Sequence, residues 1–476
     1  MRYDKTPSLP RGKCSTFNLR CFQVDEIAAR TRAIWVSARY LQNSFVPVNR
    51  LPPEVLGLIP SSLRSKRDLI NTTAVCRHWR NTLLSSPDLW CDIDCSGNRG
   101  PLREHMFREY LERSRMVPLN VRLTSVKYLP DITPCLARFS ALEIELAVPE
   151  QLRKIAAHFS QPAPILQRLD ISAAASLNRT SLSIPRLLFG GDFAPLRTFR
   201  IKGFSDLKMR QHFPHLIRFD LQIEILNTGV MLEVLERMPS LQVLRIKFRP
   251  VSHPSSTLMP TLHPMTHHKL REVELSPFES SYPDPIPFMP PLLFALTLPS
   301  AEQITIGMLP PVGSHVLPSS FEERLPNFAE TPVVDVCVGL ETFGILFHGP
   351  RGSRLLFTTH RRFYRERFHG IPFLSVQKLV LTLTGLRGGF DDYFIDLLRA
   401  RERLEYLEMK GFYTGILRFW SMKPPEEQRS ICPSLRRLMV VKQPNESVAG
   451  LLAELVMARD SHGVPLVEAI EVDSHM

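Results

Sequence analysis

The chain has 476 residues, of which 44% are hydrophobic and 22% are charged, so it is long enough for two to four domains with sizeable cores. Its 41 prolines outnumber its 22 glycines, which favours many short elements and argues against a long coiled coil or a disordered chain. The net charge of +12 comes mainly from residues 1–50 and 351–369, and two local patches do not make the extended basic face typical of nucleic-acid-binding proteins.

The eight cysteines form no CxxC pair, and Cys91 and Cys95 lack a second Cys/His pair at zinc-binding spacing. We therefore expect no metal site, and we expect buried thiols in a reducing compartment. No apolar stretch is long enough for a transmembrane helix, and no secretory signal is present. These features predict a cytoplasmic or nuclear protein without a membrane partner, with an arginine-rich transit peptide as the alternative for the N-terminus.

The N-terminal region divides into two segments. We expect residues 1–24 to be disordered and residues 25–48 to be built on a helix. Within the second segment Ile27, Ile34 and Leu41 recur at helical spacing, and the acidic pair that opens it suits the positive end of a helix.

Residues 49–92 carry the pattern of three short helices. Pro53 suits the first position of a helix, and Glu54 follows it in the first turn. Apolar residues continue the first helix and form a stripe on the third, namely Val55, Leu56, Ile59 and Leu63, then Val75, Trp79 and Leu83. Helices this short bury little surface alone, so we expect them to pack against another part of the chain.

Beyond residue 118 a unit of the form apolar-x-x-apolar-x-apolar returns about every 30 residues. Its copies begin at Leu166, Leu196, Leu216, Leu241, Leu270, Leu340, Val376, Leu404, Leu435 and Val467, with weaker copies at Ala141 and Ala301. Such a unit is typical of a strand whose alternate side chains enter a core, preceded by a residue that turns the chain inward. Helical patterns separate several copies, at Gln151–Phe159, Val230–Met238, Phe390–Ala400 and Val448–Arg459.

These strand-helix units predict an α/β fold, an irregular leucine-rich-repeat-like solenoid over residues 118–476, with 93–117 as a connecting segment. The repeat positions should be buried, and residues 445–476 should cap the end. We expect residues 277–299 and 310–332 to be loops on one rim. Because the period is irregular and an asparagine ladder is missing, an ordinary α/β domain is the alternative.

Motifs that would indicate chemistry are missing from the sequence. It contains no nucleotide-binding, serine-hydrolase or zinc-protease motif. The pair His267-His268 has no acidic or cysteine partner at metal-ligand spacing. We therefore expect no cofactor and no catalytic residues.

Residues 49–92 resemble the F-box family. The resemblance is carried by Leu51-Pro52-Pro53-Glu54-Val55-Leu56, by Val75-Cys76-Arg77-His78-Trp79-Arg80 and by Ser86-Pro87-Asp88-Leu89-Trp90. With the repeats behind it, the chain looks like the F-box proteins common in mushroom-forming fungi. The resemblance implies a small helical F-box that docks on a Skp-family adaptor in a cullin-RING ubiquitin ligase, while the repeat domain binds a protein substrate.

Eight residues would form the adaptor-facing surface or its supporting core by this resemblance, namely Leu51, Pro52, Val55, Ile59, Leu63, Leu69, Val75 and Trp79. The sequence does not separate the two roles. Pro60 departs from the family pattern, because proline in a helix interior removes a hydrogen bond and costs about 3 kcal/mol. We therefore expect the first helix to end early, at Ile59, and adaptor affinity to be affected.

Residues 351–369 form the second basic patch. A helix beginning near Thr358 or Thr359 would align a basic stripe with an aromatic one. Arginine pairs with carboxylate or phosphate through two parallel hydrogen bonds, so the patch predicts an acidic or phosphorylated partner. The arginines assigned to that partner are Arg361, Arg362, Arg365 and Arg367. A solvated insertion with arginines facing water is the alternative.

The favoured function is that of a non-catalytic substrate-recognition subunit of a Skp-cullin-F-box ubiquitin ligase. The alternatives are a scaffold or pseudo-F-box protein disabled by Pro60, a basic nucleic-acid-associated protein, and an enzyme without a recognisable motif.

Overall fold

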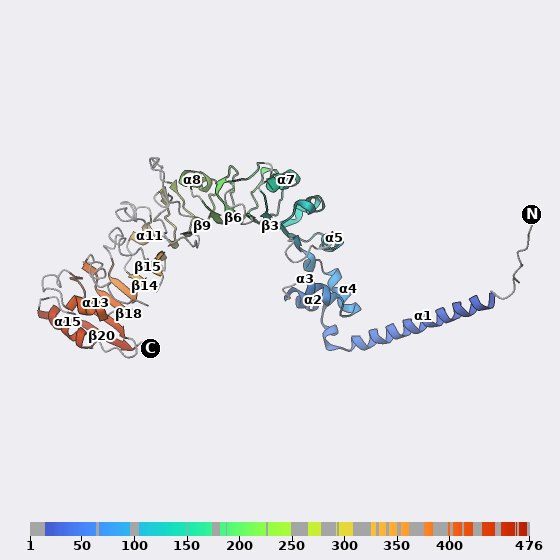
Figure 1. Ribbon diagram of the computed structural model, residues 1–476, viewed down its shortest axis with the longest axis horizontal. Helices are drawn as coiled ribbons and strands as arrows, with labels where there is room; N and C mark the ends of the chain where they lie inside the picture. The colour runs from blue at the N-terminus through green and yellow to red at the C-terminus, as the bar shows by residue number, and fades with distance from the viewer. Residues whose placement is uncertain are drawn as a thin grey trace, which may run out of the picture. The chain divides into compact units, whose positions relative to one another are not determined.

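The computed structural model describes residues 15–62, 66–95, 104–148, 150–173, 181–186, 188–224, 227–248, 265–277, 292, 295–307, 325–329, 333–338, 342–349, 354–360, 376–383, 398–399, 403–411, 414–421, 431–442, 449–461, 463 and 466–473. The chain divides into two compact units (Figure 1), Met1–Ile93 with Leu102–Leu119, and Asp94–Pro101 with Asn120–Met476. Within the described ranges, no helix is both long enough and apolar enough to cross a membrane.

Helices form the first unit. They are α1 (Ser15–Ser44), η1 (Pro47–Arg50), α2 (Pro53–Ser62), α3 (Lys66–Thr73), α4 (Arg77–Ser85), η2 (Pro87–Trp90) and α5 (Glu104–Arg113). Helix α1 includes residues 15–24, so the expectation of disorder was wrong for that stretch, and residues 1–14 lie outside the described residues. The helix extends because no proline or glycine interrupts the chain between Gly12 and Pro47.

Helix α2 includes Pro60, so the expected end of the helix at Ile59 was wrong. Proline has no N–H, so the helical hydrogen bond to the carbonyl of Leu56, one turn earlier, is missing. Helix α2 ends only two residues after Pro60, at Ser62. Pro60 is also buried, so its ring adds to the packing of the unit. A proline in the last turn therefore costs less than one in the middle of a helix.

A sheet dominates the second unit. Its strands are β1 (Asp92–Cys95), β2 (Leu119–Leu123), β3 (Phe139–Leu146), β4 (Arg168–Ala173), β6 (Thr198–Phe204), β8 (Arg218–Ile223), β9 (Val243–Phe248), β11 (Glu272–Pro277), β13 (Gln303–Ile306), β14 (Val333–Val338), β15 (Thr342–His348), β16 (Arg354–His360), β17 (Lys378–Leu383), β18 (Tyr406–Gly411), β19 (Arg437–Lys442) and β20 (Glu468–Asp473). Within the described residues the strands follow chain order except that β16, β15 and β14 are reversed between β13 and β17.

Helices connect several of these parallel strands. They are η4 (Val126–Tyr128), α6 (Leu129–Ile132), η5 (Thr133–Arg138), α7 (Glu150–His158), η7 (Leu188–Gly191), α8 (Thr228–Glu236), α11 (Pro326–Ala329), α13 (Thr414–Ser421) and α15 (Ala449–Ser461). Two short strand pairs accompany them, β5 (Ser181–Ser183) with β7 (Asp206–Lys208), and β10 (Met265–Thr266) with β12 (Leu296–Thr297). Figure 1 shows α7 and α8 on the same side of β3, β6 and β9. This succession of strands confirms a long parallel sheet consistent with a leucine-rich-repeat-like solenoid.

The repeat positions stack in register from strand to strand. Leu169 of β4 pairs with Phe199 of β6, and the row continues through Phe219, Leu244 and Val273. All five side chains are fully buried. A backbone hydrogen bond also joins each of these repeats to the previous repeat. Its donor is the N–H of the residue that follows the first leucine of the motif. The donors and acceptors are Arg197 N to Gln167 O at 2.8 Å, Ile217 N to Arg197 O at 2.8 Å and Gln242 N to Ile217 O at 2.9 Å.

Phenylalanine rings fill the core behind the first strands. Phe139 meets Phe159 edge-on at 5.7 Å between ring centroids, and Phe159 stacks on Phe189 at 6.2 Å. Further contacts join Phe193, Phe213, Phe199 and Phe219 with centroid separations of 5.1 to 5.8 Å. Large rings take up the space that an irregular period leaves between strand and crossover, and such pairs are favourable beyond the area they bury.

Strands β14, β15 and β16 depart from the repeat. Strand β15 is antiparallel to both β14 and β16, so the motif copy at Leu340 is not a repeat strand. Strand β16 continues through Thr358 and Thr359 to His360, so the helix expected to begin there was wrong. The register with β15, in which Thr358 pairs with Gly344, extends the strand across residues whose local pattern suggested a helix. Strand β12 and helix α11 also lie where only rim loops were expected.

The last strand is shifted by one residue against the expected motif. Leu438 of β19 pairs with Ala469, and Met439 pairs with Ile470. Ile470 therefore lies in the outer row of the sheet, because a one-residue shift moves side chains to the opposite face. Val467 and Ile470 are 74% and 36% exposed, so the expectation that they would be buried as repeat positions was wrong.

Candidate functional site

A small apolar core holds the helices of the first unit together. Leu56 of α2 and Leu83 of α4 are fully buried, and Trp79 is 8% exposed beside them. The Trp79 indole Nε1 donates to Asn49 Oδ1 at 2.6 Å, and Asn49 Nδ2 donates to the Asn43 carbonyl at 2.7 Å. The asparagine thus gives a buried indole its hydrogen-bond partner, which fixes η1 against α4.

A second tryptophan extends this core into the segment expected to be a connection. Trp90 is buried, and its Nε1 donates to the Leu83 carbonyl at 2.9 Å. Tyr110 of α5 meets the Trp90 ring edge-on at 4.9 Å, and the Arg113 guanidinium lies 4.8 Å from its centroid. Burial raises the pKa of the Tyr110 phenol. Helix α5 is therefore a packed part of the first unit.

The predicted adaptor-facing residues divide into two groups. Leu69 and Trp79 are buried, and Ile59 packs against the small core, so these side chains support the fold. The exposed group contains Pro52 and Val55, the latter with 41% of its side chain accessible.

The remaining three residues complete this division. Val75 belongs to the exposed group, with 61% accessible. Leu51 is half-buried at the start of α2, and Leu63 lies outside the described residues. The structure thus separates exposed from buried residues among the described members of this set, which apolar spacing alone does not.

One exposed apolar residue was missed. Leu58 of α2 is 65% exposed, more than Val55 on the same helix. It lies three residues after Val55, and residues three apart share a helix face, so the same spacing rule could have found it. The exposed side chains Val55, Leu58 and Val75 come from α2 and from the turn between α3 and α4, which pack on each other.

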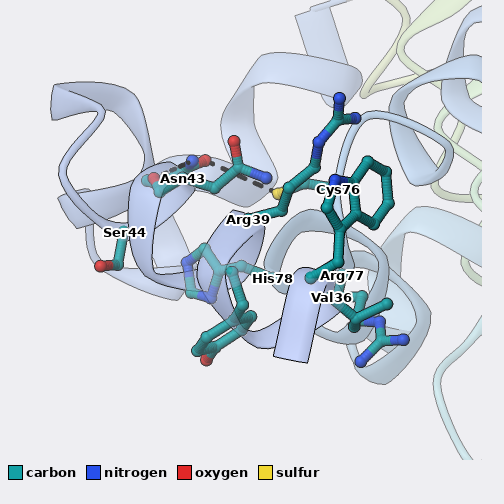
Figure 2. Close-up of a pocket in the computed structure, with 10 residues that line it drawn as sticks. Val36, Arg39, Asn43, Ser44, Cys76, Arg77 and His78 are labelled. Carbon is teal, nitrogen blue, oxygen red and sulfur yellow. Dashed lines mark hydrogen bonds between the residues drawn. The ribbon is translucent and has the colours of Figure 1, made fainter. Parts of the chain in front are cut away.

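A pocket of about 330 Å³ lies elsewhere in the first unit. Its walls come from the C-terminal half of α1, from Asn49 and from the first turn of α4, with Cys76, Arg77 and His78 (Figure 2). From α1 come Trp35, Val36, Arg39, Tyr40, Asn43 and Ser44. The Arg39 guanidinium lies 4.1 Å from the centroid of the Trp35 ring. The pocket shows which face of α1 is turned toward the helical core.

Charged side chains form a network on the outer face of the second unit's sheet. Arg200 lies between Asp170 and Asp220, with N···O separations of 3.7 Å and 3.1 Å. Arg168 contacts Asp170 at 2.6 Å, and Arg218 contacts Asp220 at 3.0 Å. The hydrogen bond to Asp170 raises the pKa of Arg168. These alternating charges largely neutralise one another across neighbouring strands.

Two exposed lysines lie beside this network. Lys202 of β6 and Lys247 of β9 both pair in register with Gln222 of β8, so they occupy the same row with one strand between them. Both are exposed. Neighbouring strands are about 4.8 Å apart, which places the two lysine positions about 10 Å from each other.

The four arginines predicted to bind a partner, Arg361, Arg362, Arg365 and Arg367, lie outside the described residues. Their role stays a prediction.

Comparison with known protein families identifies one region. The family model described as F-box-like matches residues 48–96, which cover η1, α2, α3, α4, η2 and β1. No curated protein matches the chain. The chain therefore contains an F-box-like domain at residues 48–96, followed by a long sheet of mainly parallel strands.

Proposed function

We propose that the chain is a non-catalytic substrate-recognition subunit of a Skp-cullin-F-box ubiquitin ligase. One observation carries the proposal: within the F-box-like domain, apolar side chains of α2 and of the turn before α4 remain exposed instead of entering the small core. Val55 and Val75 are 41% and 61% exposed, although such residues are usually buried. An apolar surface held on a packed core is suited to docking a Skp-family adaptor.

Pro52 and Val55 would form the centre of the adaptor surface, with Leu51 at its border. Trp79, Leu69 and Ile59 would act indirectly, by holding α2 and α4 in position. The continuation of α2 through Pro60 supports a functional F-box over a disabled one, because the helix that carries Val55 and Leu58 remains intact.

The sheet of the second unit would provide the substrate side. Because acidic and basic residues around Asp170, Arg200 and Asp220 neutralise each other, the exposed Lys202 and Lys247 are the side chains best placed to recognise a substrate. Their charge favours an acidic or phosphorylated segment, as also proposed for Arg361, Arg362, Arg365 and Arg367. No catalytic residue is needed for this role, because the ligase brings its own chemistry.

The experiment that tests the proposal measures binding of the full chain to a purified Skp-family adaptor. A Leu51→Ala/Pro52→Ala variant should bind at least about tenfold more weakly, which corresponds to about 1.4 kcal/mol. The neighbouring exposed pair gives a matched control, because Val46→Ala/Pro47→Ala removes similar atoms just outside the F-box-like match. Equal binding of all three proteins, or no binding by the wild type, would contradict the adaptor role and favour a pseudo-F-box scaffold.

A further inference from the structure

One face of α1 carries a regular apolar row. Its residues follow one another in alternating steps of three and four, and they are Val24, Ile27, Thr31, Ile34, Ala38 and Leu41. We name this row the α1 seam. Alternating steps of three and four are the spacing of the a and d positions of a coiled coil, where two helices pack along a shared stripe.

The α1 seam lies in water in the single chain. Ile27, Ile34 and Leu41 are 63%, 70% and 62% exposed, and Val24 is 64% exposed. Exposed large apolar residues that recur along one helix face indicate a contact surface more strongly than isolated ones do.

The seam points away from the rest of its own unit. An α-helix turns about 100° per residue, so Val36, Tyr40 and Asn43 share one face, and Ile34 and Leu41 lie on the opposite face. The first three residues line the pocket against α4. The helix therefore uses one face within the unit and leaves the seam for another contact.

The side chains of the α1 seam allow it to pack against the α1 seam of a second copy of the chain. Its one polar member, Thr31, already donates its hydroxyl to the Ile27 carbonyl at 2.9 Å, so its burial would leave no unsatisfied donor. The positions that flank the seam are Ala28, Arg30, Trp35, Ser37 and Gln42, of which only Arg30 is charged. Arg30 pairs with Glu26 of its own helix at 2.7 Å. A symmetric pair would therefore bring no rows of like charge together.

We propose that α1 forms a two-stranded coiled coil with α1 of a second copy of this chain. The seam from Val24 to Leu41 spans about 26 Å of helix, enough for several layers of contacts. The dimer would present two F-box-like domains and two sheets in one assembly. The proposal does not depend on adaptor binding.

Sedimentation of the full chain at micromolar concentrations tests the proposal. The wild type should sediment with the mass of two chains. An Ile27→Asp/Ile34→Asp variant should sediment as one chain, with self-association weakened by at least about a hundredfold, because the new charges would be buried unpaired. An Ala29→Asp/Ala33→Asp variant is the matched control, since it adds the same charges to exposed positions of the same helix outside the seam, and it should remain a dimer.

A second seam variant protects against loss of the helix itself. Ile34→Gln/Leu41→Gln keeps residues of good helix propensity and should also give single chains. Circular dichroism should show unchanged helix content in every variant. A wild type that sediments as one chain, or seam variants that remain dimers, would overturn the proposal.

Discussion

In the helical unit, apolar residues at regular spacing remain in water, whereas in the sheet unit they are enclosed. Val55 and Val75 are 41% and 61% exposed, while Leu244 and Phe199 are fully buried. The core of the F-box-like domain needs only a few side chains around Trp79. The sheet needs every repeat position, because each strand repeat is stable only when packed against its neighbouring repeats. The comparison teaches that exposure separates apolar residues that are available to a partner from those that hold the fold.

The largest effect on stability should come from the sheet. Leu244→Ala should lower the free energy of unfolding by about 2–5 kcal/mol, because it leaves a cavity in a continuous row of buried residues. Leu58→Ala in α2 is the contrasting control, and its effect should stay within about 0.5 kcal/mol because Leu58 is largely exposed. Urea unfolding of the full chain measures both changes. Similar losses for the two variants would break the comparison.

A smaller effect should come from the hydrogen bond that supports the helical core. Asn49→Ala removes the acceptor of the Trp79 indole, and should cost about 1–3 kcal/mol because a buried donor loses its partner. Asn43→Ala is a matched control, since Asn43 contributes its backbone carbonyl and keeps it in the variant. Unfolding followed by tryptophan fluorescence detects the loss. If Asn49→Ala left the free energy of unfolding unchanged, the hydrogen bond to the Trp79 indole would not contribute to stability.

The smallest stability effect depends on pH. His267 is 6% exposed next to β10, and its Nε2 lies 3.0 Å from the Met238 carbonyl oxygen. Burial lowers the pKa of His267, with the nearby His268 and Lys269 acting in the same direction. The unfolded chain, with an ordinary histidine pKa of 6.5, binds the proton first as pH falls, so this group's contribution to stability is present above pH 6.5 and is lost below it.

The pH effect can be assigned with two variants. His267→Gln should flatten the decline in melting temperature as the pH is lowered from 7.5 through about 6.5. An exposed histidine elsewhere in the sheet unit gives the control, since His215→Gln should keep the wild-type slope. If all three proteins showed the same slope, other groups would control the decline.

Most of the sheet could be predicted from the sequence because its repeat positions combine period and burial. Leu169 and Leu244 lie where alternation places them, in register on neighbouring strands. The predicted register of the final strand was wrong by one residue. Leu466 and Val467 are both apolar, and spacing alone does not show which of them aligns with Leu435. The reversed strands β14 to β16 depend on pairing between distant segments, which local pattern does not contain.

The candidate site could be predicted only in part. The residues of the F-box-like domain were identified by their resemblance to the family, but Val55 and Trp79 look equally apolar in the sequence and differ in exposure only after folding. The expected break at Pro60 overestimated a local effect, because its position near the end of α2 was unknown. Helix α5 was not expected to join the domain, since its contact with Trp90 is made by Tyr110, twenty residues later in the chain.

The most direct test of the account measures adaptor affinity and thermal stability together in a Val55→Asp/Val75→Asp variant of the full chain. Both side chains are exposed, so the melting temperature should change little, whereas adaptor affinity should fall by at least about a hundredfold because charges would enter an apolar contact. Val148→Asp/Val467→Asp changes two valines outside the F-box-like domain, 45% and 74% exposed, and should leave adaptor affinity unchanged. Unchanged adaptor affinity in the Val55/Val75 variant, or a large loss of stability with it, would contradict the claim that these exposed residues bind the adaptor.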